Sequence, residues 1–97
     1  MARIKELLRQ VIKMLKESCK NAQADWLEKR LHEMDTNEGA AKALKDIKTI
    51  IAGMGSLSDI YLEISKSISN DEARYNAIYR NLIKELDSEI SLYLKNI

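Results

Sequence analysis

The chain has 97 residues, of which 45% are hydrophobic and 32% are charged. It is too apolar for a disordered segment and about the length of one small domain with its own core, so we predict a single helical domain over residues 1–97. Sixteen basic and fifteen acidic residues leave a net charge of +1, which argues against a nucleic-acid-binding surface covering the whole molecule. Residues 1–20 carry +4 and the remainder −3.

The composition favours a cytoplasmic location. Cys19 is the only cysteine, so no intrachain disulfide can form, and we expect it to be a half-buried apolar residue near the end of the first helix. No apolar run approaches the roughly 20 residues that span a bilayer. Charged residues interrupt the N-terminal leucines where a secretory signal needs a continuous apolar region, so we expect neither a signal peptide nor a membrane contact.

The first half of the chain reads as three helices. Apolar residues recur at steps of three and four between about residues 3 and 20, which predicts an amphipathic helix with a basic outer face. A break at 21–23 is followed by Asp25, which we expect to cap a short helix carrying Trp26. After a polar loop and cap at 35–39, the same periodicity predicts a third helix that begins near Ala40 and ends at Gly53.

The second half is predicted to hold one long helix. Residues 57–64 fit both a short strand and a helical stripe, and we favour a helix because no partner strand is evident. Ser69 and Glu72 form a capping box, which opens a helix that runs nearly to the C-terminus. We expect its apolar residues to form one seam: Tyr75, Tyr79, Leu82, Leu86, Ile90, Tyr93 and Ile97. The predicted fold is all-α, a compact bundle of four to five helices with a glycine-rich turn before the fourth segment.

The residues needed for catalysis are mostly missing. His32 is the only histidine, which excludes a multi-histidine metal site, and with Glu28 and Glu33 it offers only a weak ligand set. Ser56 does not occupy the centre of a nucleophile-elbow pattern, and the two glycines before it do not extend into a phosphate-binding loop. We therefore expect no enzyme activity, no cofactor and no bound metal.

The turn at 53–59 is the most distinctive feature of the sequence. Two glycines one residue apart indicate a shaped backbone, and the serines and the aspartate that follow can cap the next element or contact a partner. Tyr61 follows the turn between Asp59 and Glu63, where it suits either an interface anchor or the core. The turn reads Gly53-Met54-Gly55-Ser56-Leu57-Ser58-Asp59.

With an apolar helix before it, this turn resembles that of small bacterial helical proteins that carry a glycine-methionine-glycine-serine turn ahead of an aspartate. More loosely, the chain is similar to the small all-helical immunity proteins of type VI and related polymorphic toxins. That resemblance implies a cytosolic protein that binds the catalytic domain of a cognate toxin and blocks its substrate, without catalytic residues of its own. The expected partner-binding residues, facing a basic toxin cleft, are Gly53, Met54, Gly55, Ser56, Asp59, Tyr61 and Glu63.

Two alternatives remain open. Arg9, Lys13, Lys16 and Lys20 recur at i, i+4, i+7 and i+11, so this basic face of the first helix suits phosphates or an acidic protein in a regulatory binding module. Nucleic acid is the less favoured of these partners, because the net charge is close to zero. The last helix also suits a homodimer if its apolar seam is exposed.

Overall fold

The computed structural model describes residues 2–52, 60–62 and 69–96. Within these ranges the regular elements are all helices and there is no strand, which confirms an all-α bundle. The predicted turn, Gly53 to Asp59, lies outside the described residues. The four helices are α1 (Ala2–Glu17), α2 (Asn21–Glu33), α3 (Asn37–Ala52) and α4 (Ser69–Lys95).

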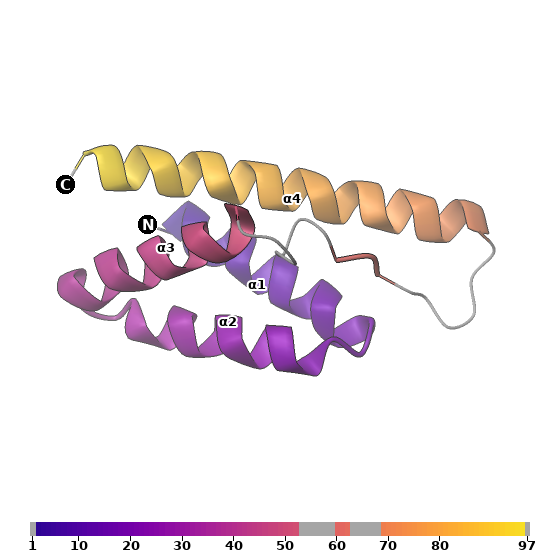
Figure 1. The fold of residues 1–97 in the computed structure, drawn as a ribbon, viewed down its shortest axis with the longest axis horizontal. Coiled ribbons are helices and arrows are strands. Elements are labelled where there is room, and N and C mark those ends of the chain that lie inside the picture. Colours follow the sequence, from indigo (N-terminus) through magenta and orange to yellow (C-terminus); the bar gives the residue numbers. More distant parts are fainter. Residues whose placement is uncertain (1, 53–59, 63–68, 97) are drawn as a thin grey trace.

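The four helices form a ring in which each packs against two neighbours (Figure 1). The backbones of α1 and α3 both lie close to those of α2 and α4, whereas the backbones of the two diagonal pairs stay farther apart. Successive helices run in opposite directions, and α4 is antiparallel to both α1 and α3. At 1.5 Å per residue, the 27 residues of α4 span about 40 Å, close to the 44 Å long axis of the molecule. The shorter α3 therefore covers only the C-terminal half of α4 (Figure 1).

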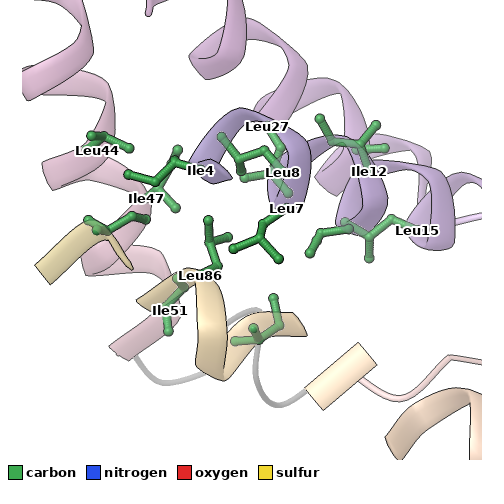
Figure 2. Packing of buried hydrophobic residues seen from close by; sticks show 14 of the residues in the cluster. Ile4, Leu7, Leu8, Ile12, Leu15, Leu27, Leu44, Ile47, Ile51 and Leu86 are labelled. Atoms are coloured by element: carbon green, nitrogen blue, oxygen red, sulfur yellow. The ribbon is translucent and has the colours of Figure 1, made fainter. Parts of the chain in front are cut away.

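Side chains from all four helices meet in one hydrophobic core (Figure 2). The helix α1 contributes the most residues to this core. The apolar periodicity in residues 3–20 predicted them correctly, because every apolar residue of α1 at these steps of three and four is buried. Tyr79, Leu86 and Ile90 of α4 are also completely enclosed, so the apolar seam of the last helix faces the core of its own chain. The buried residues of α1 are Ile4, Leu7, Leu8, Val11, Ile12, Met14 and Leu15.

The chain leaves α1 through a left-handed residue, Cys19, with φ of 61°. The Lys20 N–H donates to the Leu15 carbonyl oxygen at 2.8 Å, and the Cys19 N–H donates to the Lys16 carbonyl oxygen at 3.1 Å. This pair of hydrogen bonds defines a Schellman motif, which satisfies carbonyl groups that the last helical turn leaves unpaired.

The break between the first two helices therefore lies earlier than predicted. Because the Schellman motif turns the chain at Cys19, α2 begins at Asn21, and Asp25 lies inside the helix instead of capping it. The expected burial of Cys19 is also wrong, since its side chain is exposed. A position just after a helix end points outward because the chain reverses there.

The start of α3 is set by Thr36. Its carbonyl oxygen accepts a hydrogen bond from the Ala40 N–H at 2.8 Å, and its Oγ1 accepts one from the Gly39 N–H at 3.0 Å. The threonine cap lets the helix begin at Asn37, earlier than the Ala40 expected from apolar periodicity. Gly39 also approaches the end of α2 so closely that a Cβ there would clash with the Glu33 carbonyl oxygen.

Residues 60–62 are not helical, so the helix favoured for 57–64 is wrong at these three positions. The predicted start of the last helix at Ser69 is confirmed. Among the described helices, none is both long and apolar enough to cross a bilayer.

Candidate partner-binding surface

Asn76 of α4 holds the main chain of Leu62. The Leu62 N–H donates to the Asn76 Oδ1 at 2.7 Å, and the Asn76 Nδ2 donates to the Leu62 carbonyl oxygen at 2.8 Å. The same Nδ2 donates to the Glu72 carbonyl oxygen, one turn earlier in α4, at 2.9 Å. The amide thus gives Leu62 both a donor and an acceptor, as a neighbouring strand would.

This contact is buried, which makes it strong. Asn76 is 2% exposed and Leu62 is fully buried, so water does not compete for the hydrogen bonds between them. Leu62 belongs to the hydrophobic core, and Ile60 packs against its edge. The segment 60–62 is therefore fixed beside the half of α4 that α3 does not reach (Figure 1).

Tyr61 lies between these two anchored residues and is 48% exposed. Leu62 is fully buried, whereas the side chain of Tyr61 beside it reaches the surface. This exposure argues against the alternative of core burial, and the interface role stays a prediction. The other residues expected at the partner-binding surface lie outside the described part of the chain: Gly53, Met54, Gly55, Ser56, Asp59 and Glu63.

Tyr75 links this half of α4 to the end of α1. Its hydroxyl lies 2.8 Å from the Glu17 Oε1 and 3.3 Å from the Met14 carbonyl oxygen. Burial, together with the hydrogen bond to the Glu17 carboxylate and its charge, raises the pKa of Tyr75 to about 12, because each disfavours the phenolate. Burial also raises the pKa of Tyr79, so both tyrosines stay neutral at physiological pH.

The basic face expected on the first helix is smaller than its sequence pattern suggests. Arg9 and Lys13 are exposed, and neither forms an ion pair with any residue that the structure describes. Lys16, in contrast, pairs with Glu28 of α2. Lys20 follows the Schellman turn, so it is not part of the helix. Two of the four cations thus remain together on α1.

The weak ligand set around His32 is not assembled. Glu28 is engaged by Lys16, and Glu33 accepts hydrogen bonds from the Arg30 guanidinium at 2.8 and 3.2 Å. No group of three or more histidine, cysteine, aspartate or glutamate side chains gathers anywhere in the described ranges.

Sequence reasoning missed Asn76, although a signal for it exists. The buried positions of α4 are 76, 79, 83, 86 and 90, which follow steps of three and four without interruption. A polar residue on such a seam must find partners, because an unsatisfied buried amide costs about 1–3 kcal/mol. We predicted Tyr75 and Leu82 on the seam instead, and both lie at its partly buried edge.

No protein-family model matches this chain, and no curated protein or solved structure matches it either. Conclusions about its function therefore rest on its own residues.

Proposed function

We propose that this protein is a cytosolic immunity protein, which binds the catalytic domain of a cognate bacterial toxin through a surface centred on Tyr61 and occludes the toxin's active site. The observation that supports it is the contrast within residues 61–62. Leu62 is fully buried and held by Asn76, whereas Tyr61 is 48% exposed.

A tyrosine on a fixed main chain is a suitable anchor for a partner. Tyrosine offers a large contact area and a polar hydroxyl at the cost of only two side-chain torsions. The Asn76 clamp has already ordered the backbone of Leu62, so binding does not have to order it again. Aromatic residues in such positions are enriched among the few that dominate binding energy.

The identity of the partner as a toxin is the more specific part of the proposal, and it is supported by the sequence around Tyr61. Asp59 and Glu63 flank Tyr61, so the chain carries two acidic side chains next to its aromatic residue. Charges around an apolar anchor guide association with an oppositely charged surface, such as the basic cleft of an enzyme acting on nucleic acids or nucleotides. The loose resemblance of the chain to small all-helical immunity proteins points in the same direction.

The test is a growth assay with the product of the adjacent gene. We expect that product to stop growth when expressed alone and the wild-type protein to restore growth on co-expression. Tyr61→Ala should restore it poorly, whereas Leu92→Ala, which truncates an apolar side chain of α4 that is 55% exposed, should act like the wild type. Circular dichroism of both variants checks that each remains folded.

The outcomes separate the two parts of the proposal. If a captured partner binds the wild type and loses affinity with Tyr61→Ala but is not toxic, the surface stands and the toxin assignment fails. If Tyr61→Ala and Leu92→Ala bind equally well, the surface assignment fails. Capture of nucleic acid that is lost at high salt and by Arg9→Glu with Lys13→Glu would instead favour the regulatory module acting through α1.

A further inference from the structure

The N-terminal half of α4 has an outer face that no other described element covers. The opposite face of this half of α4 packs against α1 and holds Leu62, and α3 covers the later turns of α4. The residues opposite are exposed. We call them the α4 outer face: Arg74, Ala77, Ile78, Arg80, Asn81 and Lys84.

This face is cationic and its charges are not neutralised. Residues 73–84 contain three basic residues and no acidic one. Arg74, Arg80 and Lys84 form no ion pair within the described part of the chain. Elsewhere among the described residues of the bundle some cations are paired, as Arg3 with Glu85 at 2.6 Å and Lys48 with Asp87 at 3.1 Å show, whereas Arg9 and Lys13 of α1 are not. Unpaired charges of one sign create a local positive potential that attracts an acidic surface.

An apolar side chain lies at one edge of this face. Ile78 is 50% exposed, and it lies one turn from Arg74 and three residues from Asn81 on the helix surface. Arg80 and Lys84 lie farther round the helix. Ala77 and Asn81 are short, so a second helix can approach α4 closely beside Ile78. An apolar contact bordered by charged residues is the usual arrangement of a protein interface.

We propose that the α4 outer face is a docking surface for an acidic amphipathic helix of a partner protein. Charge complementarity and the exposed Ile78 identify this occupant. A second copy of the chain fits poorly, because a two-fold contact would bring the same three cations together. An oligonucleotide satisfies the cations and leaves Ile78 unused, and one bulky apolar residue is too few to insert into a membrane. The proposal concerns a different surface from that of Tyr61 and does not depend on the toxin.

Nuclear magnetic resonance on the ¹⁵N-labelled 97-residue chain tests the proposal. The probe is a synthetic amphipathic helical peptide with leucines on one face and glutamates on the other. We expect it to shift the amide signals of residues 74–84, and we expect Ile78→Ser to weaken its binding severalfold. A scrambled peptide of the same composition and a single-stranded oligonucleotide are the comparison ligands.

Charge reversal provides a matched pair of variants. Replacing Arg74, Arg80 and Lys84 together by glutamate should weaken peptide binding by about tenfold, since each exposed ion pair contributes modestly. The control replaces Arg9, Lys13 and Lys29 by glutamate, which makes the same charge change on exposed residues of α1 and α2 and should have little effect.

Three results would contradict the proposal. One is the absence of shifts in residues 74–84 at millimolar peptide, and another is an equal loss of affinity in the two charge-reversed variants. The third is stronger binding of the oligonucleotide to this face with no effect of Ile78→Ser, which would assign the surface to nucleic acid.

Discussion

Cys19 ends α1 in a backbone conformation that suits glycine far better. A side chain at a φ of 61° brings its Cβ close to the following carbonyl oxygen, which costs roughly 1–2 kcal/mol. Glycine has no such contact and is the usual residue at this position of a Schellman motif.

We therefore expect Cys19→Gly to raise the free energy of unfolding by about 1 kcal/mol, because relief of strain outweighs the extra freedom of glycine in the unfolded chain. Urea denaturation measures this change. Cys19→Ala is the control, since it removes the thiol and keeps the Cβ. An equal gain in both variants would show that the thiol, and not the backbone, is responsible.

Gly39 poses the opposite problem, because it lies inside a helix where alanine is normally preferred. An added Cβ would meet the Glu33 carbonyl oxygen and would lie 2.8 Å from the Thr36 Oγ1. We expect Gly39→Ala to lower the free energy of unfolding by about 2 kcal/mol, which is typical of overpacking. Lys42→Ala, at an exposed position of α3, should change it by less than about 0.5 kcal/mol in the same denaturation experiment.

The end of α1 at Cys19 and the start of α3 at Thr36 show why helix ends were the least predictable feature of the sequence. The Schellman turn carries cysteine in place of glycine, so nothing marked the end of α1, and the break was assigned to the polar residues that follow. The predicted loop and cap at 35–39 contains Thr36, whose hydroxyl and carbonyl groups begin α3, but apolar periodicity does not identify which of its residues is the cap. Both ends depend on backbone hydrogen bonds, which apolar periodicity does not report.

At the scale of elements, the segment 60–62 compensates for the difference in length between α3 and α4. The 16 residues of α3 leave the first turns of α4 without a helical neighbour on that side, and Leu62 fills part of the space. No strand lies beside this segment in the described part of the chain, and the side-chain amide of Asn76 satisfies the main chain of Leu62 instead.

The hydrogen bonds between Asn76 and Leu62 predict a large effect of Asn76→Asp on stability. The carboxylate cannot donate, so the carbonyl oxygens of Leu62 and Glu72 lose a partner and face a negative charge. We expect a loss of roughly 3 kcal/mol in the free energy of unfolding, because only the hydrogen bond from the Leu62 N–H to the oxygen of residue 76 can persist. Asn81→Asp makes the same change at an exposed site of α4 and should alter the free energy of unfolding little. An equal and small change in both variants would contradict the role assigned to Asn76.

The contact between α1 and α4 through Tyr75 predicts a pH dependence. The pKa of Tyr75 is about 12 in the folded protein, against 10.0 for an ordinary tyrosine, so the folded state holds the phenolic proton more tightly. The associated stability is complete below pH 10 and is lost as the pH rises through 12.

We expect Tyr75→Phe to be less stable than the wild type at pH 8 by about 1 kcal/mol, because the hydrogen bond to Glu17 is lost. The difference should shrink as the pH rises above 10, since only the wild type loses the contribution of the neutral phenol. Denaturation of both proteins from pH 8 to 11 measures it. All other ionisable groups are common to both proteins, so their effects cancel, and a difference independent of pH would contradict the assigned cause.

At the scale of the whole molecule, the fold was predictable as far as it depends on the periodicity of apolar residues. An all-α bundle and the burial of the α1 stripe followed from the spacing of apolar residues. The candidate surfaces did not, because Tyr61 fits the core as well as an interface until Leu62 is known to point inward. The cations of α4 were overlooked for a similar reason, since sequence alone does not show which charges find partners within the fold.

The position of the α4 seam predicts the oligomeric state. A homodimer through this helix would need an exposed apolar seam, but Tyr79, Leu86 and Ile90 are enclosed by the chain's own core. A stable interface takes about 800 Å² from each partner, out of a total surface of 6260 Å². The large apolar side chains exposed in the described residues are few and lie on three elements: Ile50, Tyr61, Ile78 and Leu92.

We therefore expect light scattering after size-exclusion chromatography to give the monomer mass of 11.1 kDa at micromolar concentration. Four separate apolar residues on three elements of the described chain are too few to form a stable homodimer interface. Twice that mass would contradict this expectation. If Ile78→Ser then restored the monomer, the α4 outer face would be the contact between two copies, in spite of its three cations, and its assignment to an acidic partner would fail.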